Sequence, residues 1–169
     1  MMNYGIAYIA IGWALAIWNE KGLYSVELGD HEAQLAALLK ARFRGLETAP
    51  TNGEGTEVFG NILKVLENPE TRLDYPLLLE GTELQRKTWQ TLQSIPPGQT
   101  VTYSELANQL GKPKAVRAVA NACGANRLAV IVPCHRVVRS DGGLGGYRWG
   151  IERKQLLLNR EAKLAAIVS

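Results

Sequence analysis

The sequence predicts a mixed α/β protein, and three observations support this fold class. The first part of the chain begins with short apolar runs separated by turn residues, which is typical of antiparallel strands. The later part carries capping-box sequences followed by apolar residues at helical spacing. The charge also changes sign: residues 1–81 carry 6 Lys/Arg against 11 Asp/Glu (−5), and residues 82–169 carry 13 against 5 (+8). We therefore predict two domains, residues 1–80 and 81–169, with an antiparallel sheet in the first and mostly helices in the second.

The N-terminal half is expected to start with a β-meander. Residues 4–11 and 13–18 are predicted strands with Gly12 at the bend, and a turn at residues 19–22 leads to a third strand over residues 23–28. Asp30 is placed to cap a helix whose apolar residues keep helical spacing. These residues are Leu35, Leu38, Leu39 and Phe43.

The rest of this half predicts a loop, a helix and a short strand. Residues 45–55 contain Pro50 and two glycines and are predicted to form an exposed loop. A helix over residues 56–66 follows, and residues 75–79 are predicted to form a short apolar strand.

Capping boxes mark the helices of the C-terminal half. The Thr82 box opens a helix through Leu92, and the Thr102 box opens another that ends at Gly111. A further helix is predicted from Lys114 to Cys123, with Gly124 as a left-handed cap. The helix that begins at Thr102, the short turn after it and the helix from Lys114 to Cys123 form a helix-turn-helix pattern. The final helix, residues 151–164, carries Glu161.

One cysteine and one histidine stand side by side in this half, at Cys134 and His135. Neighbouring side chains on a strand point to opposite faces, but Pro133 favours a strand end or the first turn of a helix, where both could reach one pocket. A helix N-terminus or a neighbouring base lowers the pKa of a thiol and makes it nucleophilic. An unreactive buried cysteine is the alternative. The glycine-dense residues 140–147 predict mobile or closely packed backbone beside this site.

Composition limits the other classes of function. Two cysteines exclude a disulfide scaffold and indicate a reducing, cytoplasmic compartment. The apolar run over residues 4–18 is too short to span a membrane, and no Lys or Arg precedes it as a signal peptide would require. His31 has no cysteine or second histidine near it, so we expect no metal. The basic half favours a polyanion partner, although a solvated basic face is the commoner meaning of such charge.

The motif of residues 133–137 resembles the O6-alkylguanine-DNA alkyltransferases when its surroundings are included. Other matching residues stand in the same order along the chain, from about residue 81 to 162. They are Tyr103, Arg117, Asn126, Tyr147 and Glu161. Within the family the likeness is strongest to the alkyltransferase half of bacterial adaptive-response regulators, including residues 147–150.

This resemblance implies a ribonuclease H-like N-terminal domain and a winged helix-turn-helix-like C-terminal domain. It also implies direct DNA repair, in which an alkyl group on guanine O6, or on thymine O4, is transferred irreversibly to Cys134 after base flipping. The implied partner is double-stranded DNA bound through its minor groove. The implied protein is a cytoplasmic monomer that reacts once and uses no cofactor and no metal.

The resemblance also assigns roles to residues of this chain. Cys134 would be the nucleophile, His135 its base through a water, and Glu161 the residue that orients His135. Tyr103 would donate a hydrogen bond to the guanine, the carbonyls of Cys134 and Val137 would accept from its amine, and Asn126 would brace the turn before the site. The expected substrate pocket includes Tyr147, Arg148 and Trp149, with Trp149 restricting bulky alkyl groups. The expected DNA contacts are Arg117 in the base stack and Lys114, Ala115, Ala118, Asn121, Ala122 and Arg136.

Three other functions remain as alternatives. A non-catalytic lesion-binding protein would keep the DNA-binding half, but Cys134 argues against it. A cysteine hydrolase or acyltransferase could use the same Cys, His and Glu set, and would turn over many times without DNA. A helix-turn-helix transcription factor would need base-specific contacts in the major groove, for which Ala115, Ala118 and Ala122 are poorly suited.

Overall fold

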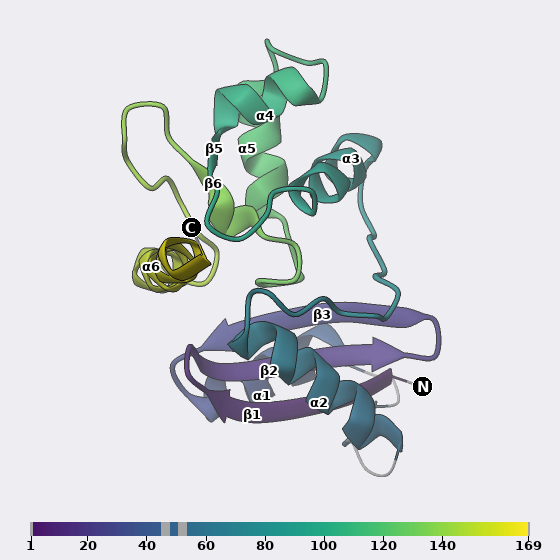
Figure 1. Cartoon of the computed structure of the whole chain (residues 1–169). Coiled ribbons are helices and arrows are strands. Elements are labelled where there is room, and N and C mark those ends of the chain that lie inside the picture. The colour runs from purple at the N-terminus through teal and green to yellow at the C-terminus, as the bar shows by residue number, and fades with distance from the viewer. Residues whose placement is uncertain (1, 45–47, 51–53, 169) are drawn as a thin grey trace. The chain divides into compact units, whose positions relative to one another are not determined.

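A computed structural model of the chain describes residues 2–44, 48–50 and 54–168 (Figure 1). It forms two compact units, one made of Met1–Leu78 with Arg127–Ile131 and the other of Leu79–Asn126 with Val132–Ser169. Residues 127–131 thus group with the first unit, although our division near residue 81 places them in the second domain. The assignment of residues 1–80 and 81–169 as two functional domains stays a prediction.

The first unit contains a four-stranded sheet in the order β3-β2-β1-β4. Its strands are β1 (Met2–Ile9), β2 (Gly12–Asn19), β3 (Gly22–Gly29) and β4 (Thr48–Pro50). The predicted meander is confirmed, because β1 pairs antiparallel with β2 and β2 with β3 through tight two-residue turns. Gly12 has a φ of +119°, which suits glycine at the first of these turns.

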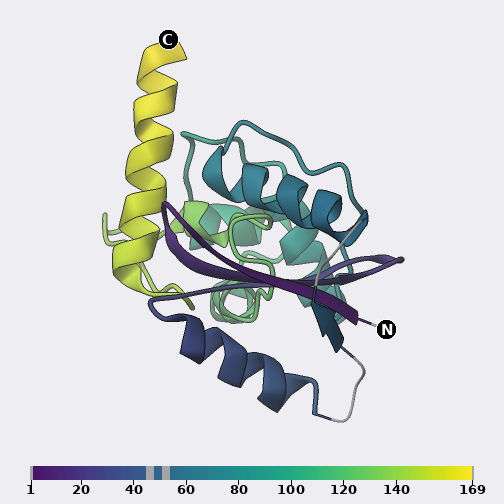
Figure 2. The ribbon, with the colours of Figure 1, turned by 90° about the horizontal axis from the view of Figure 1, so that it is seen from below.

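Two helices cover opposite faces of this sheet, α1 (Glu32–Arg42) and α2 (Glu54–Glu67), as Figure 2 shows. Alternate residues of β2 therefore enter different cores. Leu15 and Ile17 pack with apolar residues of α1. On the other face, Trp18 stacks on Phe59 of α2 with ring centroids 5.8 Å apart. Because both faces are covered, the middle of β2 is completely buried.

Several predictions for this unit are wrong in detail. The N-cap of α1 is His31 and not Asp30, and the Gln34 side chain accepts from the backbone N–H groups of both residues. Thr48–Pro50 is a strand parallel to β1, where we expected a loop; residues 45–47 and 51–53 of that loop lie outside the described part. The apolar run at residues 75–79 makes only a single bridge, between Leu77 and Leu23.

Residues Arg127–Ile131 lie along the free edge of β3. The backbone N–H of Val26 donates to the carbonyl of Arg127 (2.8 Å), and the N–H of Ala129 donates to the carbonyl of Val26 (3.1 Å). Ser25 Oγ also donates to the Arg127 carbonyl. The chain therefore runs from the second unit at Asn126, through the first unit, and back at Val132.

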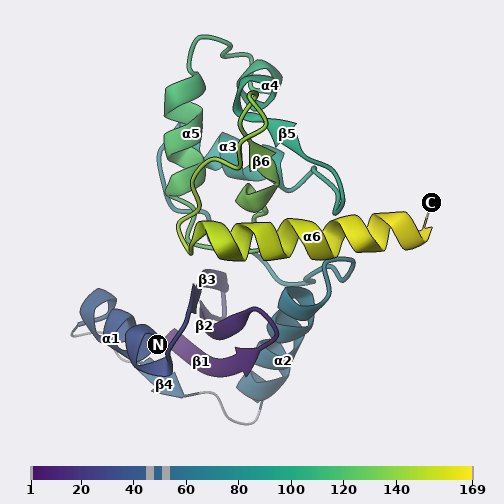
Figure 3. The same ribbon diagram turned by 90° about the vertical axis from the view of Figure 1, so that its left-hand side faces the viewer.

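Helices dominate the second unit: α3 (Glu83–Leu92), α4 (Tyr103–Gln109), α5 (Val116–Gly124) and α6 (Ile151–Val168). The first three lie against one another (Figure 3). Both predicted capping boxes are confirmed, since the side chains of Thr82 and Thr102 accept from the N–H three residues later. Helix α5 begins at Val116, with Ala115 as N-cap, so Lys114 precedes it. Gly124 remains helical and is not the left-handed cap that we predicted.

A small parallel sheet was not predicted. It joins β5 (Val101–Thr102) to β6 (Val137–Val138). A 3₁₀ turn, η1 (Cys134–Arg136), comes directly before β6, and α4 comes directly after β5. The pairing therefore links the start of α4, where Tyr103 lies, to the residues that follow Cys134. The ribonuclease H-like and winged-helix details of the fold class stay predictions.

Candidate active site

Pro133 determines how the two central residues of the site are presented. It precedes η1, so the chain turns helically at Cys134 and His135, as we predicted for one of two conformations after this proline. Both side chains are buried, Cys134 at 6% exposure and His135 at 0%. The short turn gives the two side chains separate partners in the interior of the second unit.

His135 is bound to Glu161 of α6. Its Nε2 lies 2.7 Å from Glu161 Oε2. An ionised carboxylate only accepts hydrogen bonds, so Nε2 must carry the proton and Nδ1 of a neutral imidazole is left with a lone pair. Among the described residues, Nδ1 is buried without a hydrogen-bond partner. The arrangement fits the predicted pairing of His135 with an orienting Glu161.

The protonation states follow from burial and from these bonds. Burial lowers the pKa of His135, against the opposing effect of Glu161, and so favours the neutral ring. Burial alone would raise the pKa of Glu161, but hydrogen bonds from His135 and Arg136 outweigh it and lower that pKa to about 2. The pair is therefore a neutral histidine held by an ionised glutamate.

Arg136 belongs to this buried network. Its Nε lies 2.8 Å from Glu161 Oε1 and its Nη2 3.0 Å from Oε2, which is a bidentate pair. Its Nη1 donates to the carbonyl of Ile95 (2.6 Å), and the residue is only 7% exposed. This geometry does not fit the DNA contact that we predicted for Arg136. The guanidinium instead balances the charge of the carboxylate that holds His135.

Asn126 connects Cys134 to the loop before it. Its Nδ2 donates to Cys134 Sγ (3.3 Å) and to the carbonyl of Val132 (2.9 Å), so it closes the neck of the loop over residues 127–131. Burial raises the pKa of the Cys134 thiol to about 11, while the Asn126 amide and then the Lys154 and Arg148 cations act in the other direction. The thiol is therefore protonated at neutral pH and needs a base to react. The bracing role predicted for Asn126 matches these contacts.

A cavity of about 780 Å³ opens beside Cys134 within the second unit. Most of the predicted substrate residues are among those that line it. The lining includes Tyr103, Asn121, Cys123, Cys134, Arg139, Gly145, Tyr147 and Arg148. Cys123 was not predicted as a site residue, and it is the second buried thiol of this cavity.

Tyr103 lies on one wall of this cavity, against the glycine-dense loop. Burial raises the pKa of Tyr103 to about 12, so its hydroxyl stays protonated and can donate. Gly145 has a φ of +76°, and a Cβ at this position would stand 2.7 Å from the Tyr103 hydroxyl oxygen. The loop therefore passes close to Tyr103 because Gly145 has no side chain. We expected this loop to be either mobile or closely packed, and its contact with Tyr103 is one of close packing.

Two predicted substrate residues lie behind the cavity surface. Trp149 is 6% exposed and does not line the cavity; its ring packs edge-on against Tyr147, with centroids 5.2 Å apart. This geometry therefore does not favour the direct restriction of bulky alkyl groups that we predicted for Trp149. The carbonyl of Val137 accepts from Lys154 Nζ at 2.7 Å.

Lys154 is a site residue that the sequence did not reveal. It is completely buried, and its Nζ donates to the carbonyls of Val137 (2.7 Å), Leu144 (2.5 Å) and Gly146 (3.2 Å). The ammonium also lies 5.9 Å from the centroid of the Tyr103 ring. One cation of α6 thus holds the glycine-dense loop to β6. A lysine on a helix is usually solvated, so no local signal predicted its burial.

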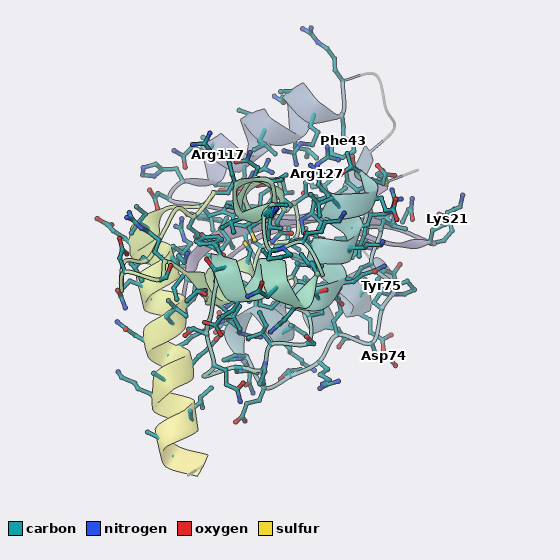
Figure 4. All side chains as sticks on the ribbon, turned by 90° about the horizontal axis from the view of Figure 1, so that it is seen from above. Lys21, Phe43, Asp74, Tyr75, Arg117 and Arg127 are labelled. Atoms are coloured by element: carbon teal, nitrogen blue, oxygen red, sulfur yellow. The ribbon has the colours of Figure 1, made fainter. Side chains whose placement is uncertain are left out.

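The exposed side of α5 carries part of the predicted DNA-contact set. Arg117, labelled in Figure 4, is exposed together with Ala118 and Asn121, and Lys114 is exposed just before the helix. Ala122 is 2% exposed and its carbonyl accepts from Trp89 Nε1 (2.8 Å), so this residue faces α3. A direct DNA contact by the Ala122 side chain does not fit this burial. Ala115 is half-buried at the N-cap.

Two further features bear on the class of site. No group of three or more metal-binding side chains lies together in the described part of the chain. Over the same residues, no helix has both the length and the apolar character that a membrane span needs. The fold and the cavity define a protein with a buried free cysteine on a cavity, beside a His, Glu and Arg network.

Comparison with known proteins agrees with this class. Residues 83–163 match the family model described as "6-O-methylguanine DNA methyltransferase, DNA binding domain". The chain is 46% identical over 162 residues to the bifunctional transcriptional activator/DNA repair enzyme Ada of Escherichia coli, covering 96% of this chain and 46% of that protein. It is 38% identical to a methylated-DNA–protein-cysteine methyltransferase of Debaryomyces hansenii, covering 95% of this chain and 91% of that one.

A solved structure extends the likeness to the fold. The Mycobacterium tuberculosis OGT, determined in complex with DNA, superposes with a TM-score of 0.78 at 33% identity, covering 95% of this chain and 93% of that one. The chain belongs to the methylated-DNA–protein-cysteine methyltransferase family. It spans about half the length of the Escherichia coli and Salmonella Ada proteins that it matches.

Proposed function

We propose that this protein repairs alkylated DNA by transferring the alkyl group from O6-alkylguanine, and also from O4-alkylthymine, to its own Cys134. The single observation that supports this most strongly is the buried Cys134 thiol, which opens on a cavity and accepts a hydrogen bond from Asn126. The names of the family members describe the same chemistry. The product is a thioether, which water does not cleave, so each molecule reacts once.

The chemical step is an in-line displacement. Cys134 Sγ attacks the alkyl carbon, the carbon–O6 bond breaks, and its electron pair stays on the guanine. The thiol proton is lost as sulfur attacks, and one proton returns to the guanine, so the thiol hydrogen replaces the alkyl group. With a thiol pKa of about 11, the reaction depends on a base.

His135 is the proposed base, acting through one water at Nδ1. Nδ1 carries the lone pair because Nε2 donates to Glu161, and it is buried without a partner among the described residues. A buried acceptor without a hydrogen bond costs on the order of 1–3 kcal/mol, which favours a bound water at this atom. Glu161 and Arg136 act as positioning residues that keep the ring in the right tautomer.

The same proposal places the flipped base in the cavity. Tyr103 donates to the guanine as negative charge develops, and the carbonyls of Cys134 and Val137 accept from the guanine amine. The Val137 oxygen would accept with the lone pair that its bond to Lys154 Nζ leaves unused. The base leaves the stack at an energetic cost of a few kcal/mol, which is smallest for a damaged pair. Tyr147 and Arg148 also line the cavity, and we assign them to the side that faces the alkyl group.

DNA binds through the minor groove against α5. Arg117 enters the stack in place of the flipped base, and Lys114, Ala115, Ala118 and Asn121 approach the backbone and the groove floor. Small side chains on this face permit close approach, and the minor groove carries little sequence information, which suits a repair protein. The protein acts as a monomer in the cytoplasm and needs no metal or cofactor for this reaction.

Intact-protein mass spectrometry tests the proposal directly. The protein is incubated with a duplex that contains one O6-methylguanine, in parallel with Cys134→Ala and Cys123→Ala. Both cysteines are buried and line the same cavity, so they form a matched pair. We expect the gain of a single methyl group that is lost in Cys134→Ala and retained in Cys123→Ala.

Other outcomes would lead to different conclusions. Tight binding to the lesion duplex without any gain in mass would identify a lesion-binding protein. A gain in mass that persists in Cys134→Ala would show that another residue accepts the methyl group. If the protein showed no binding to the lesion duplex and no gain in mass, the result would favour a cysteine hydrolase or acyltransferase.

A further inference from the structure

The cavity beside Cys134 has a positively charged lining. Arg139 and Arg148 both line it, and none of the described lining residues is an Asp or a Glu. A neutral alkyl group such as methyl has no charge for these cations to bind. The charge of the lining therefore bears on which alkyl groups the site accepts.

Arg148 is held close to the nucleophile by its contacts. Its Nη1 donates to the carbonyl of Asn126 (3.2 Å), and Asn126 is the residue whose side chain donates to Cys134 Sγ. The guanidinium carbon also lies 5.7 Å from the centroid of the Trp149 ring. Trp149 is itself buried, so it provides a fixed surface on which the guanidinium rests.

Arg139 is the weaker of the two cations. It forms an ion pair with Asp141 (2.5 Å), and the two side chains are 60% and 58% exposed. Asp141 neutralises much of its charge, and solvent screens the remainder. The charge of Arg148 acts on the Cys134 thiol, whose pKa it lowers, so Arg148 is the main candidate for an electrostatic effect on the alkyl group.

We propose that Arg148 adapts the site to alkyl groups that carry a negative charge, with O6-carboxymethylguanine as the test substrate; this inference rests on the alkyl transfer proposed above. An anionic alkyl group brings its carboxylate close to the sulfur, which is itself negative as it attacks. A fixed cation beside the sulfur offsets this repulsion and binds the carboxylate.

The reaction balances in the same way as methyl transfer. Cys134 Sγ attacks the methylene carbon, the sulfur–carbon bond forms, and the carbon–O6 bond breaks with its electron pair left on guanine. The thiol proton is lost and guanine takes one up. The products are guanine and S-carboxymethylcysteine, and no oxidant or reductant is required.

The test compares transfer rates for two alkyl groups of nearly equal size. Identical duplexes carry O6-carboxymethylguanine or the neutral O6-(carbamoylmethyl)guanine, with an O6-methylguanine duplex as reference. Because the phosphates are the same, any contact of Arg148 with DNA cancels in the carboxymethyl-to-carbamoylmethyl rate ratio. Single-turnover rates are measured for the wild type, Arg148→Gln, Arg148→Lys and Arg139→Gln, and for Arg72→Gln, an exposed cation of the first unit.

Arg148→Gln should lower the ratio by about tenfold or more, the usual effect of a hydrogen bond to a charged group. Arg148→Lys should retain part of the preference, Arg139→Gln should change the ratio less, and Arg72→Gln should leave it unchanged. An unchanged ratio in Arg148→Gln, or a larger effect of Arg139→Gln, would overturn the assignment. Failure of the wild type to accept methyl would overturn the proposed function and this inference with it, whereas normal methyl transfer with an unchanged ratio would overturn this inference alone.

Discussion

Lys154 Nζ lies 2.7 Å from the carbonyl oxygen of Val137, inside the second unit and out of contact with water. Burial lowers the pKa of this lysine, yet three carbonyl oxygens surround the ammonium and satisfy its donors. The cation thereby joins α6 to β6 and to the loop that forms one side of the cavity.

Lys154→Met should destabilise the protein and slow alkyl transfer. It removes the donors of three buried carbonyls, for a cost on the order of 2–4 kcal/mol in the free energy of unfolding. Urea denaturation and single-turnover rates provide the measurement. Lys163→Met, an exposed lysine on the same helix, is the control and should change neither quantity. Equal effects of the two variants would contradict the role of Lys154.

Glu161→Gln should lower the transfer rate by at least about tenfold and also lower stability. The amide leaves Arg136 without its charged partner and weakens the hold on the His135 tautomer. Glu152→Gln, an exposed change at the start of α6, is the control. A rate that is unchanged at full stability would remove Glu161 from the proposed mechanism.

Stability should fall as the solution is acidified. The pKa of Glu161 is held at about 2 in the folded protein, below its ordinary 4.5, so the unfolded state binds more protons. The ionised glutamate therefore contributes up to about 3 kcal/mol above pH 4.5, and this contribution is lost as the pH falls toward 2.

His135 also contributes to the loss of stability on acidification, and its effect begins at a higher pH than that of Glu161. Its folded pKa is also lowered, so its contribution begins to fade below its ordinary value of 6.5. Unfolding free energies between pH 7 and pH 3 check both effects. Glu161→Gln should flatten the curve below pH 4.5, and a wild-type curve that rises on acidification would contradict the assigned protonation states.

Gly145→Ala and Gly142→Ala form a matched pair in the glycine-dense loop. Both glycines have a positive φ, +76° and +88°, so alanine should cost about 1–2 kcal/mol at either position. Only at Gly145 does the new Cβ meet Tyr103, at 2.7 Å from its hydroxyl, whereas nothing lies within 4 Å at Gly142. Gly145→Ala should therefore slow methyl transfer much more than Gly142→Ala. Equal rates would show that Tyr103 tolerates displacement.

Ala118→Glu should weaken DNA binding by roughly tenfold at low salt. It places a negative charge beside Arg117 on the exposed side of α5, where the phosphate backbone is expected to approach. Ala37→Glu, on the exposed side of α1, makes the same change of charge at a position far from Ala118 in the sequence and serves as the control. Fluorescence anisotropy with a lesion duplex at several salt concentrations gives the affinities. Unchanged binding by Ala118→Glu would remove α5 from the proposed interface.

Helices with local signals were predictable from the sequence. Thr82 and Thr102 cap their own helices through residues three positions away, so the information lies within one turn. The meander was also predictable, because apolar strands separated by two-residue turns pair with their neighbours. The apolar run at residues 75–79 pairs with β3 only at the Leu77–Leu23 bridge, because hydrophobicity alone does not determine how far a strand pairing extends.

The parts that could not be predicted depend on distant residues. Each of the two strands β5 and β6 has only two residues, and their pairing joins Val101 to Val137. Arg136 and Lys154 have the charge of surface residues, but Glu161 and three carbonyl groups make their burial possible. The motif around Cys134 indicated the chemistry of the site, whereas these supporting contacts required the structure.

The course of residues 127–131 makes this chain a poor candidate for division into separable pieces. A cut after Leu78 would divide the sequence near its change of charge, yet it would detach β3 from the backbone groups of Arg127 and Ala129 that complete its edge. A fragment that carries Cys134 would then contain a short edge segment without its sheet. Recombination that exchanged only one half of the gene would have to preserve this shared edge, so the two halves are under a common constraint.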